Sequence, residues 1–318
     1  MQHRAMEHFR ALFLIGQTAS GKGAAAWLLA QRTGAEIISL DSMKLYRGMD
    51  IGTAKPPAER RATVRYHMID VADPHEHFST ALYVEGAERA AWDIVVRGAV
   101  PLFVGGTALY LKAITEGLFE GPGADPELRA KLRQEAVEFG IPHLHERLAR
   151  VDPEAAGRIH PNDLRRIERA IEVYEKTGTP ISKLQSQFGT PSDKVDSVIM
   201  GLRREKADLE DRIGRRVDAM MAGGLLDEVK RVAAGPKPLG KEAAQAVGYK
   251  EILAYLGGEC GRDEAVDLIK LHTRQFAKAQ MTWFKRIPNV EWFDVAADET
   301  PEQIADRLTD FARQARAS

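Results

Sequence analysis

A lysine at the end of a glycine-rich segment is the first group in this sequence that could do chemistry. The segment reads Gly-Gln-Thr-Ala-Ser-Gly-Lys from Gly16 to Lys22, follows an apolar run and precedes a helix-like stretch. This is the G-x-x-x-x-G-K frame of a phosphate-binding loop, in which backbone N–H groups and a helix N-terminus bind an anion. The Lys22 ammonium would add a positive charge beside the phosphate.

Position 23 departs from this frame. Such loops usually continue with Ser or Thr, whose hydroxyl binds Mg²⁺, whereas Gly23 offers only a backbone N–H. The anion site is expected to tolerate this change, but one protein ligand for a metal ion is lost. The departure therefore weakens a nucleoside-triphosphatase interpretation more than a diphosphate-binding one, and Ser20 or Thr18 could supply a hydroxyl instead.

Two further polar groups are expected beside this loop. Asp41 follows the β-branched run Glu36–Leu40, and Thr107 follows the run Val100–Val104 and a Gly-Gly pair. Because ligands bind at the carboxyl ends of parallel strands, both side chains should face the bound group. We predict Asp41 to be a general base or a metal ligand. The alternatives are that Asp41 only caps the loop after it, and that the glycines only form a strand-to-helix turn.

The elements that position these groups alternate between strand and helix. Apolar runs at Ala11–Ile15, Glu36–Leu40 and Val100–Val104 are separated by the helix-like stretches Ala24–Arg32 and Ala81–Val96. This alternation predicts a parallel sheet with crossover helices, which is the doubly wound α/β class. We therefore expect a P-loop-type parallel sheet core flanked by helices.

The pattern changes in the middle of the chain. From Asp125 to Thr177 the sequence is helical throughout, and an apolar strand pattern returns at Val195–Leu202. The dipeptides Asp125-Pro126 and Asp152-Pro153 are typical helix starts. We expect an inserted all-helical domain at 119–195 within an α/β core formed by 1–118 and 196–318.

Composition limits the remaining possibilities. The chain has 318 residues, 45 Lys and Arg against 46 Asp and Glu, and one cysteine, Cys260. This is ordinary globular composition, which excludes collagen-like, disordered and coiled-coil proteins. A single cysteine excludes a disulfide framework and favours a reducing compartment, so we expect a cytoplasmic protein. No apolar run reaches the roughly 20 residues that span a bilayer, so no membrane association is expected.

Several longer blocks of sequence resemble one known family, tRNA dimethylallyltransferase, also called tRNA isopentenyltransferase. They occur in the family's order over almost the whole chain, which makes the resemblance far more specific than a phosphate loop alone. The blocks are Ser39–Pro56, His67–Asp70, Val104–Tyr110, Ile159–Asp163, Arg165–Tyr174, Ala246–Glu251 and Gln280–Lys285.

The resemblance implies that the chain is a prenyltransferase enzyme. A dimethylallyl group would move from dimethylallyl diphosphate to N6 of adenosine 37, next to the tRNA anticodon. Asp41 would be the general base, Thr107 would hydrogen-bond near the reacting amine, and Arg212 would clamp the diphosphate, although Arg212 could also belong to a solvated helix face. The resemblance implies Mg²⁺ as the cofactor, with no metal ligand assigned. The predicted diphosphate-binding residues are Gly16, Gln17, Thr18, Ala19, Ser20, Gly21, Lys22 and Gly23.

The second implied partner is the tRNA anticodon stem-loop, and no obligate protein partner is evident. From Lys270 to Val290 the sequence is basic without an acidic residue, and Arg165 and Arg169 share one helix face. A solvated helix face is the alternative for each, and we expect Trp283 to be core more readily than an RNA contact. The predicted tRNA-binding residues are Asp41, Ser42, Met43, Lys44, Thr107, Arg129, Arg165, Arg166, Ile167, Glu168, Arg169, Gly248, Tyr249, Lys250, Arg274 and Lys278.

Departures from the family pattern leave two alternatives open. Besides Gly23, Lys44 replaces a usual Gln, Glu210 replaces a usual aromatic residue, and Ala279 replaces a usual basic residue. These changes allow a catalytically weakened tRNA-binding homologue. A small-molecule P-loop kinase, with Asp41 as the base for a hydroxyl, is the other alternative, and Gly23 argues against it.

Overall fold

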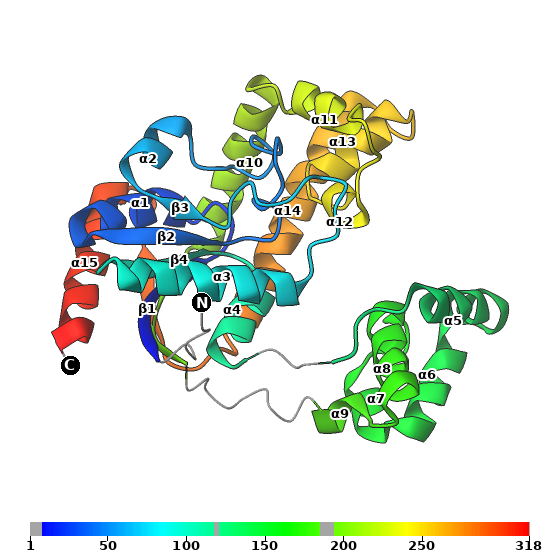
Figure 1. The fold of residues 1–318 in the computed structure, drawn as a ribbon. Coiled ribbons are helices and arrows are strands. Elements are labelled where there is room, and N and C mark those ends of the chain that lie inside the picture. Colours follow the sequence, from blue (N-terminus) through cyan, green and yellow to red (C-terminus); the bar gives the residue numbers. More distant parts are fainter. Residues whose placement is uncertain (1–7, 118–120, 185–193, 318) are drawn as a thin grey trace. The chain divides into compact units, whose positions relative to one another are not determined.

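The computed structural model describes residues 8–117, 121–184 and 194–317 (Figure 1). The chain divides into two compact units, one formed by Met1–Thr115 with Asp193–Ser318 and the other by Glu116–Ser192. The first unit contains the sheet, and the second contains only helices among its described residues. The predicted boundary between residues 118 and 119 lies outside the described residues.

The described sheet has six strands, all parallel, in the order β3-β2-β4-β1-β5-β6. The strands are β1 (Phe9–Gly16), β2 (Ala35–Leu40), β3 (Tyr66–His67), β4 (Val100–Gly105), β5 (Val195–Arg204) and β6 (Val290–Val295). The prediction of a parallel α/β sheet flanked by helices is confirmed. The central strand β1 pairs with β4 and β5, so its end at Gly16 is flanked by the ends of both neighbours.

Helices cover both faces of this sheet. The helices of this unit are α1 (Lys22–Thr33), α2 (Ala58–Thr63), α3 (Thr80–Val96), α4 (Ala108–Thr115), α10 (Lys206–Ala222), α11 (Leu225–Ala233), α12 (Lys241–Ala244), α13 (Tyr249–Leu256), α14 (Arg262–Phe284) and α15 (Pro301–Ala317). Figure 1 shows α3 and α4 on one face and α1 and α15 on the other.

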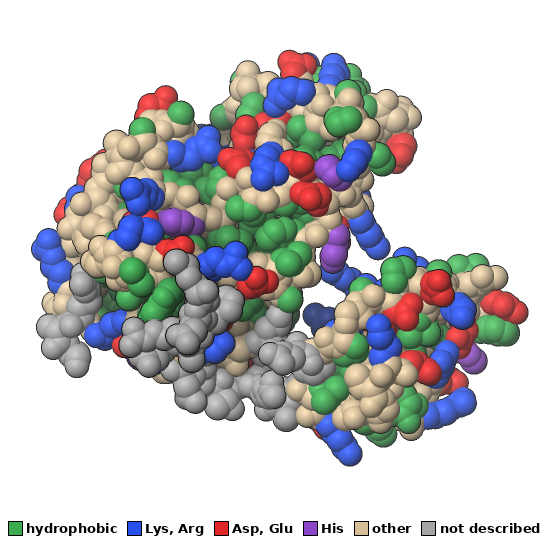
Figure 2. All heavy atoms as spheres, in the orientation of Figure 1, with side chains coloured by type: hydrophobic (Ala, Val, Ile, Leu, Met, Phe, Trp, Pro, Cys, Tyr) green, Lys and Arg blue, Asp and Glu red, His purple; other side chains and the backbone are tan. Residues whose placement is uncertain are grey.

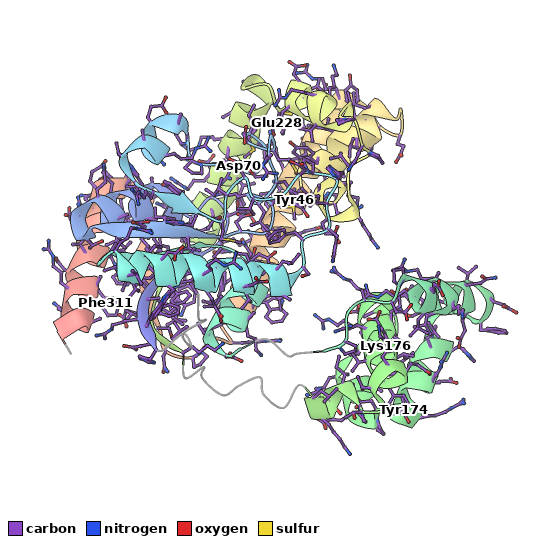
Figure 3. The ribbon with its side chains drawn as sticks, viewed as in Figure 1. Tyr46, Asp70, Tyr174, Lys176, Glu228 and Phe311 are labelled. Carbon is purple, nitrogen blue, oxygen red and sulfur yellow. The ribbon has the colours of Figure 1, made fainter. Side chains whose placement is uncertain are left out.

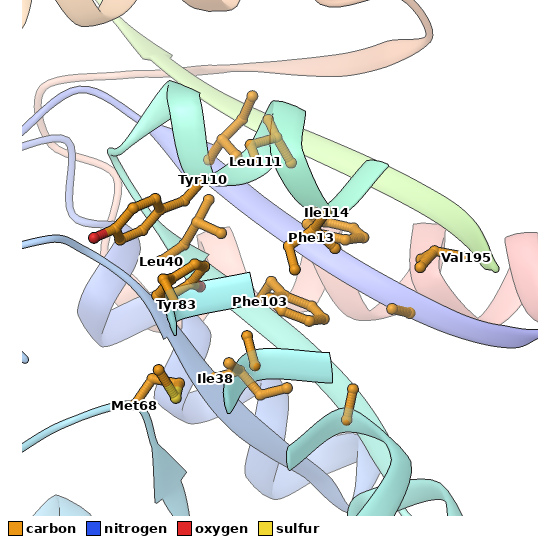
Figure 4. Close-up of a cluster of buried hydrophobic side chains, with 14 of the residues drawn as sticks. Phe13, Ile38, Leu40, Met68, Tyr83, Phe103, Tyr110, Leu111, Ile114 and Val195 are labelled. Carbon is orange, nitrogen blue, oxygen red and sulfur yellow. The ribbon is translucent and has the colours of Figure 1, made fainter. Parts of the chain in front are cut away.

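Alternation along β1 divides the core between the two faces. Phe13 belongs to the cluster beneath α3 and α4, while Leu12 and Leu14 belong to the cluster beneath α1 and α15. In the first cluster the Phe13 and Phe103 rings stack with centroids 4.6 Å apart (Figure 4). Because each buried strand has apolar side chains on both faces, the strands read as continuous apolar runs in the sequence.

The helical unit has its own core. Its helices are α5 (Pro126–Phe139), α6 (Ile141–Val151), α7 (Pro153–Arg158), α8 (Leu164–Thr177) and α9 (Ile181–Leu184). Leu132, Leu144, Leu148, Ile167 and Ile171 are buried together between them. The two predicted helix starts are confirmed, because the Asp125 carboxylate accepts the Leu128 N–H and the Asp152 carboxylate accepts the Ala155 N–H.

On the face shown in Figure 2, charged side chains of both signs are interspersed, in keeping with the nearly balanced composition. Across the described ranges, no helix is both long enough and apolar enough to cross a membrane.

Candidate active site

The phosphate loop joins the end of β1 to the start of α1. Ala19 and Gly21 have φ angles of 63° and 95°, in the left-handed region that lets the chain turn sharply into the helix. The Lys22 ammonium donates a hydrogen bond to the Gln17 carbonyl at 3.0 Å. Lys22 therefore reaches back across the mouth of the loop, as a phosphate-binding lysine must.

A glutamine on α14 ties this loop to the neighbouring strand. Gln280 accepts the Thr18 N–H at 2.8 Å and donates to the Gly106 carbonyl at 2.9 Å. A Cβ atom at Gly106 would lie 2.1 Å from the Gln280 amide nitrogen, so only glycine fits there. Gln280 thus joins the ends of β1 and β4, and the second glycine of the Gly-Gly pair is explained by this close contact.

Two arginines hold the loop from the side of β5 and α10. Arg204 donates to the Ser20 carbonyl and Arg212 donates to the Ala19 carbonyl, each at 2.9 Å. A Cβ atom at Gly21 would lie 3.6 Å from one guanidinium nitrogen of Arg204 and 3.8 Å from one of Arg212. The predicted residue Arg212 therefore lies beside the loop and supports its backbone.

Asp41 and Thr107 lie at the adjacent ends of β2 and β4. One Asp41 carboxylate oxygen accepts the Met43 N–H at 2.9 Å and the Lys44 N–H at 3.3 Å. The Thr107 hydroxyl accepts the Ser42 N–H at 3.1 Å, which leaves its own hydrogen available to donate. Asp41 does cap its loop, as the alternative held, but its second oxygen has no hydrogen bond recorded within the described residues.

Three cationic side chains surround Asp41. Burial, Lys44 and Arg216 together lower the pKa of Lys22 to about 7, and Asp41 opposes the shift. Burial also lowers the pKa of Arg216, again opposed by Asp41. These charges influence one another, so Lys22, Asp41, Lys44 and Arg216 share one site on the sheet's carboxyl edge. All four side chains are half-buried.

Arg216 is a candidate functional residue that the sequence reasoning missed. It lies four positions after Arg212 on α10, which puts both on one helix face. Arg212 is engaged by the loop backbone, whereas Arg216 has no hydrogen bond or ion pair recorded within the described ranges. The i, i+4 spacing was visible in the sequence, but only the fold reveals which arginine has a free guanidinium.

Some predicted RNA-binding residues in this unit have buried side chains. Tyr249 is fully buried and donates from its hydroxyl to Glu228, which also accepts the N–H groups of Asp50, Ile51 and Gly52. Figure 3 labels Glu228 together with Tyr46 and Asp70, which belong to the same region of the unit. Gly248 is buried too, and its N–H is bound by Glu251. The Tyr249 ring therefore packs inside the unit, and only Lys250 of this predicted group is exposed.

The α14 helix exposes basic and aromatic side chains on different faces. Lys278 is exposed and Arg274 is half-buried. Phe276 is 47% exposed and Trp283 is 40% exposed, so Trp283 lies at the surface rather than in the core, contrary to our expectation. The rings of Phe276 and Trp283 share one helix face, roughly half a turn away from Arg274 and Lys278.

In the helical unit the predicted residues divide into two groups. The carboxylate of Glu172 accepts hydrogen bonds from Arg129 and Arg169 at 2.7 to 2.8 Å. Glu168 is 4% exposed and is held by Arg133, and Ile167 is fully buried. Arg129, Arg169, Ile167 and Glu168 therefore stabilise the unit through their side chains. Arg165 and Arg166 are exposed at its surface, where Arg166 lies 3.4 Å from Asp163.

Comparison with known proteins gives consistent matches. Two family models match, IPP transferase over residues 44–287 and isopentenyl transferase over residues 9–73. A tRNA dimethylallyltransferase of Symbiobacterium thermophilum is 46% identical over 303 residues, which cover 95% of this chain and 94% of that protein. One of Thermotoga neapolitana is 47% identical over 281 residues, covering 88% and 90%.

Solved structures agree. The full-length tRNA isopentenylpyrophosphate transferase of Bacillus halodurans superimposes with a TM-score of 0.70 at 38% identity, covering 96% of each chain. A eukaryotic dimethylallyltransferase acting on tRNA gives a TM-score of 0.82 at 26% identity, covering 97% of this chain and 79% of that one. The similarity therefore extends well beyond the phosphate loop.

Proposed function

The chain belongs to the IPP transferase family of tRNA dimethylallyltransferases, and from this premise we propose that it transfers a dimethylallyl group from dimethylallyl diphosphate to N6 of adenosine 37, next to a tRNA anticodon. The observation that carries this proposal is the position of Asp41 and Thr107 beside the mouth of a phosphate loop, among Lys22, Lys44 and Arg216. The cationic side chains can bind the diphosphate that leaves in the first half of the reaction. The carboxylate and the hydroxyl can serve the attack by the amine in the second half.

The first half is departure of the diphosphate. The bond between the allylic carbon and the diphosphate oxygen breaks, and the electron pair leaves with the oxygen. Loop N–H groups, Lys22 and Arg216 would stabilise this developing negative charge. Arg204 and Arg212 act through the loop, because each holds one of its carbonyl groups and so fixes the direction of its amides.

The second half is attack by the exocyclic amine. A carbon–nitrogen bond forms, and one N6 proton must be removed, because an aromatic amine is a weak nucleophile. Asp41 is the group we assign to take that proton with its free oxygen, while Met43 and Lys44 hold the other oxygen in place. Thr107 would donate its hydroxyl hydrogen to the amine nitrogen or to the bridging oxygen.

For tRNA binding we assign the exposed basic residues. These are Lys250 and Lys278 in the sheet-containing unit and Arg165 and Arg166 in the helical unit. Arg274, which is half-buried, lies one helical turn before Lys278 on α14. Phosphate contacts from such residues give salt-dependent affinity, while unpaired loop bases supply the specific contacts. The target base must leave its stack to reach Asp41.

Magnesium fits the residues of this site poorly. Gly23 supplies no oxygen, and the Ser20 hydroxyl lies beneath the loop, since a Cβ atom at Gly16 would lie 3.1 Å from it and 3.0 Å from the Leu202 carbonyl. Among the described residues, no group of three His, Cys, Asp or Glu side chains could hold a metal. Asp41 and the half-buried Thr18 hydroxyl remain, beside three cationic groups, whereas Mg²⁺ prefers six oxygen ligands.

The test is direct. The protein is incubated with unmodified tRNA and labelled dimethylallyl diphosphate, and label in tRNA is measured in parallel with ATP hydrolysis. Prenyl transfer without ATP hydrolysis is the expected result. Hydrolysis without transfer would support the kinase alternative, and tRNA binding with neither reaction would support the catalytically weakened homologue.

A further inference from the structure

Two positions beside the phosphate loop, 23 and 44, depart from the family pattern in opposite ways. Gly23 provides no side-chain oxygen for a cation, and Lys44 provides an additional cation. They come from different elements, since Gly23 is in α1 and Lys44 is in the loop after β2. The inference that follows concerns their combined effect and rests on the proposed function.

Position 23 has space for a side chain that it does not use. A Cβ atom there would have no heavy atom within 4 Å, and the backbone of Gly23 does not have a positive φ. The glycine is therefore required neither by packing nor by backbone conformation. Serine would fit at this position, so the absence of a hydroxyl is a chemical property of the site.

Lys44 lies in the loop after β2, where its backbone contacts Asp41. Its backbone N–H is bound by Asp41 at 3.3 Å, and its carbonyl accepts the Asp70 N–H at 3.2 Å, so the backbone is fixed at both polar groups. Burial lowers the pKa of the Lys44 ammonium, Asp41 opposes this shift and Arg216 adds to it. Lys44 also has the largest effect of any charged group on the pKa of Lys22. The two ammonium groups therefore influence each other's charge.

A comparison with Lys55 shows what is unusual about Lys44. The Lys55 ammonium is also removed from solvent, but it is paired with Asp50 at 2.9 Å and with Asp70 at 2.6 Å, and it donates to the Tyr46 carbonyl. No hydrogen bond or ion pair of the Lys44 ammonium is recorded within the described residues. Cationic groups that are partly desolvated and close together are unfavourable without an anion.

We propose that Lys44 binds the diphosphate in this chain, and that with Lys22 and Arg216 it neutralises the leaving group without a metal ion held by the protein. The Lys44 N–H is bound by Asp41 at the end of β2, and the Lys22 ammonium donates to the Gln17 carbonyl in the phosphate loop. A diphosphate between them would meet a cation on each side. The added ammonium thus supplies the positive charge that a metal bound at position 23 would otherwise supply.

The first test measures inorganic pyrophosphate binding by calorimetry in EDTA and in Mg²⁺. The wild-type protein should bind pyrophosphate in EDTA at least as tightly as in Mg²⁺. Lys44→Met, which keeps the side-chain length and removes the charge, should bind about tenfold or more weakly in EDTA. Lys44→Gln should behave like Lys44→Met. Lys230→Met on α11, which removes an exposed ammonium outside this group, should bind as wild type does.

The second test restores the oxygen ligand. Gly23→Ser combined with Lys44→Met should bind pyrophosphate more tightly in Mg²⁺ than in EDTA, reversing the wild-type order. Equal binding by wild type and both Lys44 variants, or a wild-type protein that binds pyrophosphate only with Mg²⁺, would overturn the inference. Wild-type protein that transfers prenyl groups while showing either result would leave the proposed function intact. A wild-type protein without binding or transfer would overturn both.

Discussion

At the scale of single residues, the environment of Lys22 determines whether its side chain is protonated near neutral pH. The described residues hold it beside two other cations, and burial together with Lys44 and Arg216 lowers its pKa to about 7. The free protein therefore carries this positive charge fully only well below pH 7, and loses it as the pH rises through about 7. A bound anion favours the charged form and must raise this pKa again.

It follows that pyrophosphate binding should take up protons between about pH 7 and 9, and that its affinity should fall over this interval. Calorimetry in buffers of different ionisation enthalpy measures this uptake. Lys22→Arg keeps its charge throughout the interval, so the difference between the two proteins isolates the contribution of Lys22. Identical uptake by both proteins would exclude Lys22 as its source.

Asp41 allows a separate prediction about catalysis. Asp41→Asn keeps the size of the side chain and an oxygen that can accept the Met43 and Lys44 N–H groups, but removes the base. Single-turnover prenyl transfer should fall by about 10²–10⁴-fold, while tRNA affinity stays within roughly twofold. Single-turnover kinetics and filter binding measure the two quantities. If affinity fell as far as the rate, Asp41 would be a binding residue instead.

At the scale of elements, Glu172 organises the helical unit. Burial alone would raise its pKa, but hydrogen bonds from Arg129, the Asp125 N–H and Arg169 lower it to about 2. Because this lies below the ordinary value of 4.5, the stabilisation is complete above pH 4.5 and is lost as the pH falls toward 2. The group couples α8 to the start of α5 and is independent of the phosphate loop.

Glu172→Gln should destabilise this unit by roughly 3 kcal/mol. This is the lower end of the range for breaking a buried ion pair, because the arginine side chains are partly exposed. Hydrogen exchange should rise across residues 121–184 and not in β1 or β4. The acid sensitivity of this region between pH 4.5 and 2 should also shrink. Glu154→Gln, which affects an exposed pair on α7, serves as the control. Unchanged exchange would mean that Glu172 is not required.

The sequence predicted the elements better than the contacts between them. Apolar runs ending at Gly16, Leu40 and Gly105 were sufficient to predict three strand ends and the groups beside them. The roles of Gln280 and Arg216 could not be predicted, because their partners lie on elements far away in the chain. The spacing of apolar residues along the sequence carries no information about which polar side chain will contact which loop.

The same limit applies in the helical unit. Two arginines on one helix face predicted an RNA surface, yet Arg169 is held by Glu172 in the same helix, and Arg165 is exposed. Both arrangements have the same spacing in the sequence. Only packing of α5 against α8, which buries the glutamate, separates them.

At the scale of the whole molecule, affinity for tRNA should come from cations spread over both units rather than from net charge, which is -1. Binding should weaken steeply with salt, with each phosphate contact adding about 0.7–0.9 to the slope of log K against log[salt]. Lys278→Ala and Arg165→Ala should each reduce that slope by about 1. Lys230→Ala should not change it. Slopes measured by filter binding that are equal in all four proteins would exclude both residues as phosphate contacts.

The helix α14 has a consequence for how the two substrates influence each other. Its Gln280 joins the phosphate loop to the end of β4, and two residues earlier lies the exposed Lys278, which we propose as an RNA contact. If one ligand shifts this helix, the protein's affinity for the second ligand changes. By reciprocity, pyrophosphate and tRNA must change each other's affinity by the same factor. We expect pyrophosphate to tighten tRNA binding as much as tRNA tightens pyrophosphate binding, and Gln280→Leu to remove this cooperativity. The cooperativity between the two substrates then depends on one helix that joins their sites.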